Sequence, residues 1–407
     1  MVRAVLGGEP RTVGIVTGGH FLSHFYWLVL PPLFPMLRAD LGLSNAQLGL
    51  TLSAISFATL LQIPFGELVD RIGAKAVFVF GVGITGLGIT LAGLSGSYLA
   101  LLAFVLLSGI GQATFHPADY PLLEAVSDDG GQGRSFSVHT FGGYVGFAVA
   151  PIVAGAIGVR YGWRTALVAL GTVGIGYAVF AALTLRPVYR QRMDELAASD
   201  SEPGGSSIGA LLRPGILFMF VFFFLMTFAS KGVQSFTPIL ALDGLALSEA
   251  VGNTALSAFF AMTAIGVLVG GPLADRRDPT RVIPVFLTIA AAGIWLTVSG
   301  FVPVGSVALV GLFAAVGGAF GLVFPSRDRL VSDLSADGST GRSFGFVFTG
   351  TAISGMASPF LLGSVIDLAS VPLAFRFIAV FFLAAGLLAL LLGIRLGTAT
   401  SVPSSAD

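Results

Sequence analysis

The sequence contains no cysteine and few charged residues. The absence of cysteine excludes disulfide bonds, thiolate metal sites and cysteine nucleophiles. Only 10% of the 407 residues are Asp, Glu, Lys or Arg, whereas an ordinary soluble domain has about 25%. A chain with so few charges cannot cover a normal water-exposed surface, so a soluble enzyme is disfavoured.

An excess of basic residues is also missing, because 21 Lys and Arg balance 21 Asp and Glu. We therefore expect no nucleic-acid partner. No Gly-Lys-Ser or Gly-Lys-Thr motif is present to cradle nucleotide phosphates, so we do not expect ATP to power the protein. No nucleophile–base pair is apparent, and His20 and His24, which have metal-ligand spacing on a helix, lack an evident third ligand. We predict no enzymatic activity, no cofactor and no metal site.

Long hydrophobic runs are what the sequence does contain, with 55% of its residues hydrophobic. A bilayer core about 30 Å thick needs about 20 mostly apolar residues per helix. Twelve runs meet this length and predict an all-α polytopic membrane protein with twelve transmembrane helices. They lie at about 12–37, 45–67, 76–95, 99–123, 136–159, 164–185, 214–240, 248–270, 282–301, 306–333, 343–365 and 374–395.

A polar stretch, residues 186–213, separates the sixth run from the seventh, and its Ser/Gly-rich middle is typical of a flexible linker. We therefore divide the chain into an N-terminal six-helix bundle (1–185), this linker, a C-terminal six-helix bundle (214–396) and a tail (397–407). Most loop Lys and Arg residues fall on the side of the termini and the linker, which the positive-inside rule places in the cytoplasm. We expect a multi-pass protein of the inner membrane without a cleaved signal peptide, because the first run is full length.

The two halves of the chain repeat one another. The segment SDDGGQGRSF at 127–136 matches SADGSTGRSF at 335–344 in seven of ten places. A second pair, GELVDR at 66–71 and GGPLADR at 270–276, aligns Gly66, Asp70 and Arg71 with Gly271, Asp275 and Arg276. Two related six-helix halves with a site between them are the architecture of many secondary transporters.

The stretch from Gly66 to Lys75, GELVDRIGAK, resembles the loop 2–3 signature of the major facilitator superfamily, and its weaker copy follows the eighth run. GIGQATFHPADYPLL at 109–123 and SHFYWLVLPPLFPMLRADLGLSNAQLGL near the start are similar to the fosmidomycin-resistance branch. The resemblance implies two pseudo-symmetric bundles that alternate access to a central site. One departure is that Phe104, Val105 and Leu106 stand where the family often carries an Arg, so a mechanism based on that Arg is not carried over.

Ionisable residues inside the predicted membrane spans are costly and usually face a cavity. Except for His139 in the fifth span, they lie in spans 1, 4, 7 and 10, which the resemblance identifies with the lining of the central cavity. These residues are His20, His24, His116, Asp119, Lys231, Arg327, Asp328 and Arg329.

The cations in the second half predict a substrate that carries an anionic group, such as a carboxylate or phosphonate, held by Lys231 and Arg327. The full set of predicted substrate-binding residues is His24, Tyr26, His116, Tyr120, Lys231, Gln234 and Arg327. Two alternatives stay open: Lys231 snorkels to the outer interface, or Arg327 and Arg329 form a cytoplasmic rim with Asp328 or Asp333.

Asp119 is the only carboxylate well inside the first half and is the predicted proton-coupling residue, together with His24 and His116. A buried carboxyl group gains or loses a proton in response to its surroundings, and histidine titrates near neutral pH. The alternatives are that Asp119 pairs with Arg327 across the two halves and that the histidines only pack.

Conformational roles are predicted for Gly66, Asp70, Arg71, Asp275 and Arg276, because in the family this loop resembles a latch close to the amino end of helix 11. Gly146 and Pro151 join them. They belong to a run of small residues in the fifth span that resembles the helix 5 signature of exporters, and generic close packing is the alternative.

The sequence therefore predicts a monomeric secondary transporter, working by alternating access and coupled to protons, whose partners are a small-molecule substrate, protons and the lipid bilayer. Efflux of a small organic compound by antiport is favoured by the resemblance. The alternatives are proton-coupled uptake of a small organic anion such as a carboxylate, and a sensor that binds a ligand without moving it.

Overall fold

The computed structural model describes residues 9–127, 131–185, 213–335 and 340–400. Helices of the first half are α2 (Pro10–Trp27), η1 (Pro31–Leu33), α3 (Phe34–Leu41), α4 (Asn45–Ala58), η2 (Thr59–Leu61), α5 (Gln62–Ile72), α6 (Ala74–Gly93), α7 (Tyr98–Gln112), α8 (Phe115–Glu124), α9 (Gln132–Tyr161) and α10 (Trp163–Thr184). Those of the second half are α13 (Pro214–Ile239), η3 (Leu240–Gly244), α14 (Glu249–Arg276), α15 (Pro279–Val298), α16 (Ser306–Leu334), α17 (Thr340–Leu368) and α18 (Val371–Thr400).

Twelve of these helices or helix pairs are long and apolar enough to cross a membrane, which confirms the predicted number of spans. The first, second and fourth spans are interrupted where the sequence predicts continuous helices. Proline explains the breaks, because it has no N–H to donate to the preceding turn. Pro31 and Pro32 form the turn η1 between α2 and α3, Pro64 follows η2, and Pro117 leaves the Ala113 carbonyl without its helical donor between α7 and α8.

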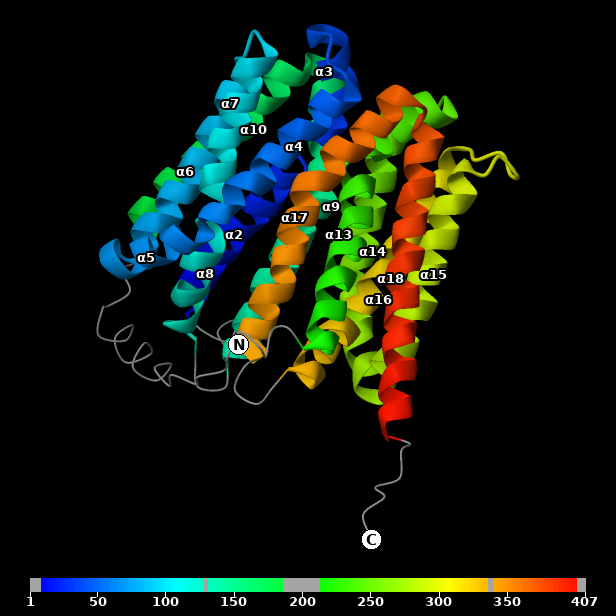
Figure 1. Ribbon diagram of the computed structural model, residues 1–407. Coiled ribbons are helices and arrows are strands. Elements are labelled where there is room, and N and C mark those ends of the chain that lie inside the picture. The colour runs from blue at the N-terminus through cyan, green and yellow to red at the C-terminus, as the bar shows by residue number, and fades with distance from the viewer. Residues whose placement is uncertain (1–8, 128–130, 186–212, 336–339, 401–407) are drawn as a thin grey trace.

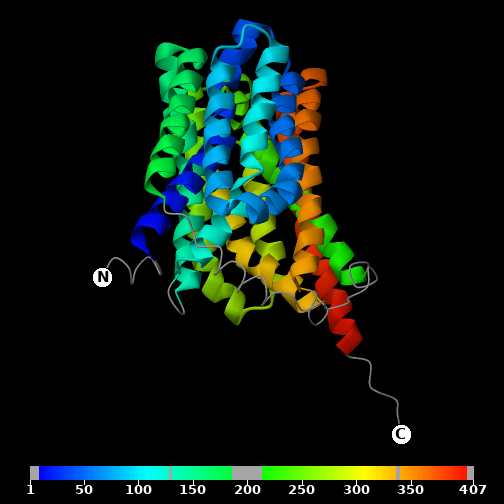
Figure 2. The ribbon, with the colours of Figure 1, turned by 90° about the vertical axis from the view of Figure 1, so that its left-hand side faces the viewer.

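The helices form two six-span bundles that stand side by side, α2 to α10 on one side and α13 to α18 on the other (Figure 1). The halves meet where α4 packs on α17 and where α9 packs on α14. Figure 2 shows the start of α2 and the end of α18 at the same, lower end of the bundle. We call this the terminal end, and we call the end that holds α3 the opposite end. The residue boundaries of the four-part division stay a prediction, and residues 186–212 of the linker lie outside the described residues.

The internal repeat has a structural counterpart in the way the first and fifth spans of each half pack. In the first half α9 crosses α2, where a Cβ on Gly146 would come within 3.1 Å of Phe21 backbone carbon. In the second half α17 crosses α13 in the same register, and Ser354, the repeat partner of Gly146, donates a hydrogen bond to the Phe224 carbonyl at 2.8 Å. The two halves therefore share the position of this helix contact. In the first half it is a close approach of backbones at a glycine, and in the second half it is a hydrogen bond from a serine.

The opposite end carries polar contacts between the two halves. Arg38 at the end of α3 forms a two-pronged ion pair with Asp243 in η3, in which Nη2 donates to Oδ1 at 2.9 Å. Asp367 near the end of α17 accepts hydrogen bonds from the backbone N–H groups of Asn45 (2.9 Å) and Ala46 (2.8 Å), the first residues of α4. These contacts hold the halves together at this end.

Candidate functional site

All four histidines of the chain gather around one buried carboxylate. His20 and His24 lie four residues apart on one face of α2, and His116 and Asp119 lie three residues apart on one face of α8. His139 approaches from α9. We call these five residues the histidine cluster. It joins three helices of the first half.

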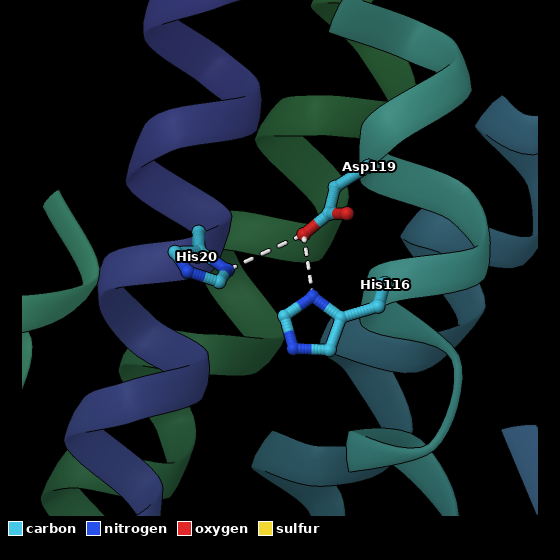
Figure 3. A group of neighbouring side chains, drawn as sticks. All are labelled: His20, His116 and Asp119. Atoms are coloured by element: carbon cyan, nitrogen blue, oxygen red, sulfur yellow. Dashed lines mark ion pairs between the residues drawn. The ribbon is translucent and has the colours of Figure 1, made fainter. Parts of the chain in front are cut away.

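One oxygen of Asp119 is the centre of the histidine cluster. Its Oδ2 atom lies 3.0 Å from His139 Nε2, 3.3 Å from His20 Nδ1 and 3.9 Å from His116 Nδ1. Figure 3 shows His20 and His116 pointing toward this oxygen from α2 and α8. The His20 ring stacks on that of His139 at a centroid distance of 3.8 Å and lies 4.2 Å from that of His24.

The atoms at the centre of the histidine cluster are buried and lack well-formed hydrogen bonds. Asp119 is fully buried and His20 is 4% exposed. Neither oxygen of Asp119, nor Nδ1 of His20, nor either ring nitrogen of His139 has a hydrogen-bond partner of acceptable geometry. Unpartnered buried polar groups cost about 1–3 kcal/mol each, so this arrangement is expensive unless protons, water or an ion complete it.

Gly143 on α9 makes room for the imidazole rings. A Cβ at this position would lie 2.6 Å from His24 Nδ1 and 2.8 Å from His20 Nε2. Phe147, one turn further along α9, covers His24 at a ring distance of 4.2 Å. The small residue at 143 and the ring at 147 therefore fix where α2 presents its two histidines.

Lys231 lies in a second site, a small cavity of about 10 Å³ between the two halves. Two helices from each half contribute to its wall, which consists of Trp27, Leu52, Ser56, Lys231, Gln234, Ser235 and Pro359. The Lys231 ammonium lies 4.2 Å from the centre of the Trp27 ring. Within the described residues it has no acidic partner. The side chain thus points at the other half, which the snorkelling alternative does not predict.

Gln234 shares the wall of this cavity with Lys231, one turn further along α13. Its amide nitrogen donates to the Trp27 carbonyl at 3.4 Å, which links α13 to α2 across the interface. The structure thus brings together two of the predicted substrate-binding residues, and it adds Trp27 of the first half to them.

Arg327 pairs with its neighbour Asp328 at 3.0 Å, and its guanidinium lies 3.9 Å from the centre of the Phe324 ring. Arg329 pairs with Asp333 at 3.5 Å and also donates to the Ala274 carbonyl. Both arginines therefore have the local acidic partners of the rim alternative. The alternative pair between Asp119 and Arg327 is not formed, since Asp119 contacts histidines.

The two predicted tyrosines lie outside the cavity of Lys231. Tyr26 is 1% exposed, and its hydroxyl donates to the Leu170 carbonyl at 2.8 Å, so it packs α2 against α10. Tyr120 is 40% exposed and stacks on His116 at 5.6 Å, so it borders the histidine cluster.

The residues of the predicted latch lie at the surface. Asp70 and Arg71 end α5, which packs on α6 and α8, and Arg71 pairs with Glu67 at 3.6 Å. Among the described residues Asp70 has no ion-pair partner, and residues 336–339, which precede helix 11 and its expected contact with Asp70, lie outside them. Gly66 and Gly271 face open space, and Asp275 and Arg276 are exposed at the end of α14.

Pro151 is buried inside α9, as is Gly146, which lets α9 approach α2. The small residues of this span therefore serve close packing between these two helices. A conformational role for Gly146 and Pro151 stays a prediction.

Sequence reasoning left two contributors out of the predicted site set. His139 was set apart because it lies in the fifth span, and Trp27 was not included among the predicted substrate-binding residues. Only the spacing of His20 and His24 signalled a cluster, because His139 and Asp119 are brought together by helix packing rather than by spacing.

Comparison with known proteins gives consistent results. The sequence model of the family described as Major Facilitator Superfamily matches residues 16–252 and 231–406. The fosmidomycin resistance protein of Escherichia coli (strain K12) is 23% identical over 387 residues, which cover 90% of this chain and 89% of that protein. The probable nitrate transporter NarT of Staphylococcus epidermidis is 24% identical, with 95% of both chains covered.

Among solved structures, the chain is similar to a bacterial homologue of the human lysosomal transporter Spinster in an inward-facing and occupied conformation. The TM-score is 0.79 at 16% identity, and the match covers 98% of this chain and 100% of that one. The similarity therefore extends over both bundles.

Proposed function

The chain belongs to the major facilitator superfamily, and from this premise we propose that it exports a small organic anion in exchange for protons by alternating access. The family and the fold are those of membrane transporters that act on small molecules, and not of enzymes. We propose below the substrate class, the coupling ion, the direction of transport and the orientation of the protein in the membrane.

The setting of Lys231 carries the proposed substrate class. An ammonium group in a cavity between the halves, with an aromatic face beside it and no carboxylate near it among the described residues, is a site for an anion. The cavity volume of about 10 Å³ is close to the minimum, about 10–15 Å³, that holds a single water molecule. In this conformation it is too small for an organic compound, so we propose that the halves separate around Lys231 to admit the substrate, and Gln234 then offers an amide for a second polar group.

Arg327 is a second cation that lies nearer the terminal end than this cavity. Its guanidinium lies 4.7 Å from the ring of Phe223, which precedes Lys231 on α13 by two turns, about 12 Å along the helix. We propose that an anion on its way through the protein meets Lys231 in the cavity and Arg327 nearer the terminal end. In this conformation, Arg327 forms an ion pair with Asp328.

The histidine cluster supports the proposed proton coupling. Asp119 is buried, and the imidazoles of His20, His116 and His139 lie within 4 Å of its carboxylate. His116 is 48% exposed at its side chain and is therefore the member of the histidine cluster near Asp119 that a group from outside the cluster can reach. We propose Asp119 as the coupling residue, with His116 and His24 as the groups that pass protons to and from it.

We further propose that the terminal end faces the cytoplasm of a cell with this protein in its inner membrane, where it acts as a monomer. The distribution of loop Lys and Arg supports this orientation. The contacts of Arg38 with Asp243 and of Asp367 with α4 then close the extracellular side. Similarity to the fosmidomycin resistance protein supports export, whereas the cationic cavity is equally compatible with proton-coupled uptake.

The proposal is tested with purified protein in liposomes that contain a pH-sensitive dye, challenged with small carboxylates, phosphonates and uncharged hydrophobic drugs. We expect proton movement with an anionic compound and opposite flow of substrate and protons. The Asp119→Asn variant is expected to lose the proton signal, and Lys231→Ala to lose transport of the anion.

Arg281→Ala is the matched control, since Arg281 is an exposed cation at the start of α15. Substrate and proton flow in the same direction would replace export by uptake. Substrate flux without a proton signal would exclude the role of Asp119, and unchanged transport by Lys231→Ala would exclude the anion site.

A further inference from the structure

We propose that His20, His116 and Asp119 form a binding site for a divalent transition-metal ion of the zinc type. The three residues offer two imidazole nitrogens and a carboxylate oxygen whose atoms all lie within 4.8 Å of one another. Imidazole with carboxylate is a donor set suited to Zn²⁺ and its neighbours in the first transition row. Figure 3 shows these side chains converging from α2 and α8.

The spacing of the donor atoms is close to what a bound ion requires. Ligands at about 2.0–2.1 Å from a tetrahedral Zn²⁺ are about 3.3 Å from one another. The distance from Asp119 Oδ2 is 3.3 Å to His20 Nδ1 and 3.9 Å to His116 Nδ1. These two distances exceed the ideal separation by less than about 1 Å, and a fourth position is left for water or another ligand.

The burial of two of the three donors, Asp119 and His20, is a second, independent observation. Asp119 is fully buried. Both of its oxygens and the Nδ1 atom of His20 lack hydrogen-bond partners. A metal ion would satisfy the oxygen and the nitrogen at once. A cation there would also balance the carboxylate, which has no Lys or Arg within ion-pair distance among the described residues.

A metal site also needs an outer partner that orients its ligand and a route by which the ion enters, and His139 and His116 provide these. His139 Nε2 lies 3.0 Å from the same Asp119 oxygen and is positioned to hold the carboxylate in place, as the outer partners of metal ligands usually do. The side chain of His116 is 48% exposed, which provides an entry route for an ion. The site lies within one half of the protein, so an ion bound there does not tie the two halves together.

The metal site shares Asp119 and His116 with the proposed proton-coupling group, but its test does not depend on that proposal, because binding of an ion is measured without transport. It is tested on the full chain, purified without a polyhistidine tag and stripped with a chelator. Zn²⁺ is titrated by calorimetry, and Co²⁺ is followed by its visible ligand-field absorption. We expect one equivalent of either ion to bind, with Zn²⁺ displacing Co²⁺.

Variants separate this site from adventitious binding. His116→Ala and Asp119→Asn are each expected to weaken Zn²⁺ binding by at least about tenfold. His24→Gln is the matched control and is expected to keep the affinity, since His24 is a histidine of the same cluster that does not contact Asp119.

A variant that gains a spectroscopic band shows that the site is intact, which loss of binding in a poorly folded variant cannot show. The chain has no cysteine, so His116→Cys introduces a single thiolate, which is expected to retain Zn²⁺ and to add a sulfur-to-Co²⁺ charge-transfer band. The proposal is overturned if the unaltered chain binds neither ion, or if His116→Ala and Asp119→Asn bind Zn²⁺ as the unaltered chain does.

Discussion

At the scale of single residues, Gly143 shows how one missing side chain shapes the histidine cluster. The rings of His20 and His24 occupy the space that a Cβ on Gly143 would need. Helix propensity alone would favour alanine here, so the glycine is explained by the rings that it accommodates.

We predict that Gly143→Ala displaces these two rings, because the new methyl group would lie 2.6–2.8 Å from them. Overpacking of this kind costs about 1–3 kcal/mol, so we expect a lower unfolding temperature together with a weaker proton signal in liposomes. Gly14→Ala on the same helix as the histidines is the control, because nothing lies within 4 Å of its new methyl group. If the two variants had the same unfolding temperature and the same proton signal, the proposed role of Gly143 would be contradicted.

At the scale of elements, α4 and α17 form a close contact between the two halves. A Cβ on Gly363 of α17 would lie 2.6 Å from the Asn45 carbonyl carbon, and one on Gly49 of α4 would lie 3.0 Å from Phe360 N. Small residues at such crossings let helix backbones approach one another in a membrane. The approach brings Asp367 onto the amino end of α4, where a carboxylate is favoured by free N–H groups and the helix dipole.

We predict that Asp367→Ala opens the opposite end. Removal of a helix-capping side chain costs about 1–2 kcal/mol, and here the cap comes from the other half, so the loss shifts the balance between closed and open forms by about 5–30-fold. Ser56→Cys, in the cavity wall of a chain without other cysteines, reports this as faster labelling by a membrane-impermeant maleimide from that side.

Asp278→Ala is the control for this measurement, because Asp278 caps α15 within a single half by accepting from Thr280 N at 2.9 Å. It should reduce stability without changing the labelling rate. Equal labelling of Ser56→Cys with and without Asp367→Ala would show that this cap does not hold the opposite end closed.

At the scale of the whole molecule, the contacts between the halves are unevenly distributed. Arg38 with Asp243 and Asp367 with α4 tie the halves at the opposite end, whereas Asp70, near the terminal end, has no ion-pair partner among the described residues. Alternating access exchanges one closed end for the other, so we expect Asp70 to make its contact only when the opposite end is open.

We therefore predict that Asp70→Asn lowers the turnover rate severalfold and leaves substrate affinity within about twofold, a change well under 1 kcal/mol. The measurement compares equilibrium binding with initial transport rates. Asp333→Asn is the control, since Asp333 is an exposed acid that pairs within its own helix. A large change in affinity would place Asp70 in the binding site instead of the latch.

The sequence by itself determined the number of membrane spans, the internal repeat and the family, because each depends on residues close together in the chain or on a fixed motif. Long apolar runs predict helices of bilayer length without any knowledge of their neighbours. The prolines at 31, 32 and 117 were visible as well, yet the resulting breaks in helix 1 and helix 4 were not predicted, since many membrane helices tolerate proline.

Only the tertiary structure decided which of the buried polar residues meet. Arg327, assigned to the substrate together with Lys231, pairs with its neighbour Asp328, and Lys231 faces Trp27 of the other half. His139 joins Asp119 although the two lie on separate helices with unrelated motifs. Helix rotation and crossing fix these encounters, and they depend on packing along the full length of each helix, which no local pattern in the sequence records.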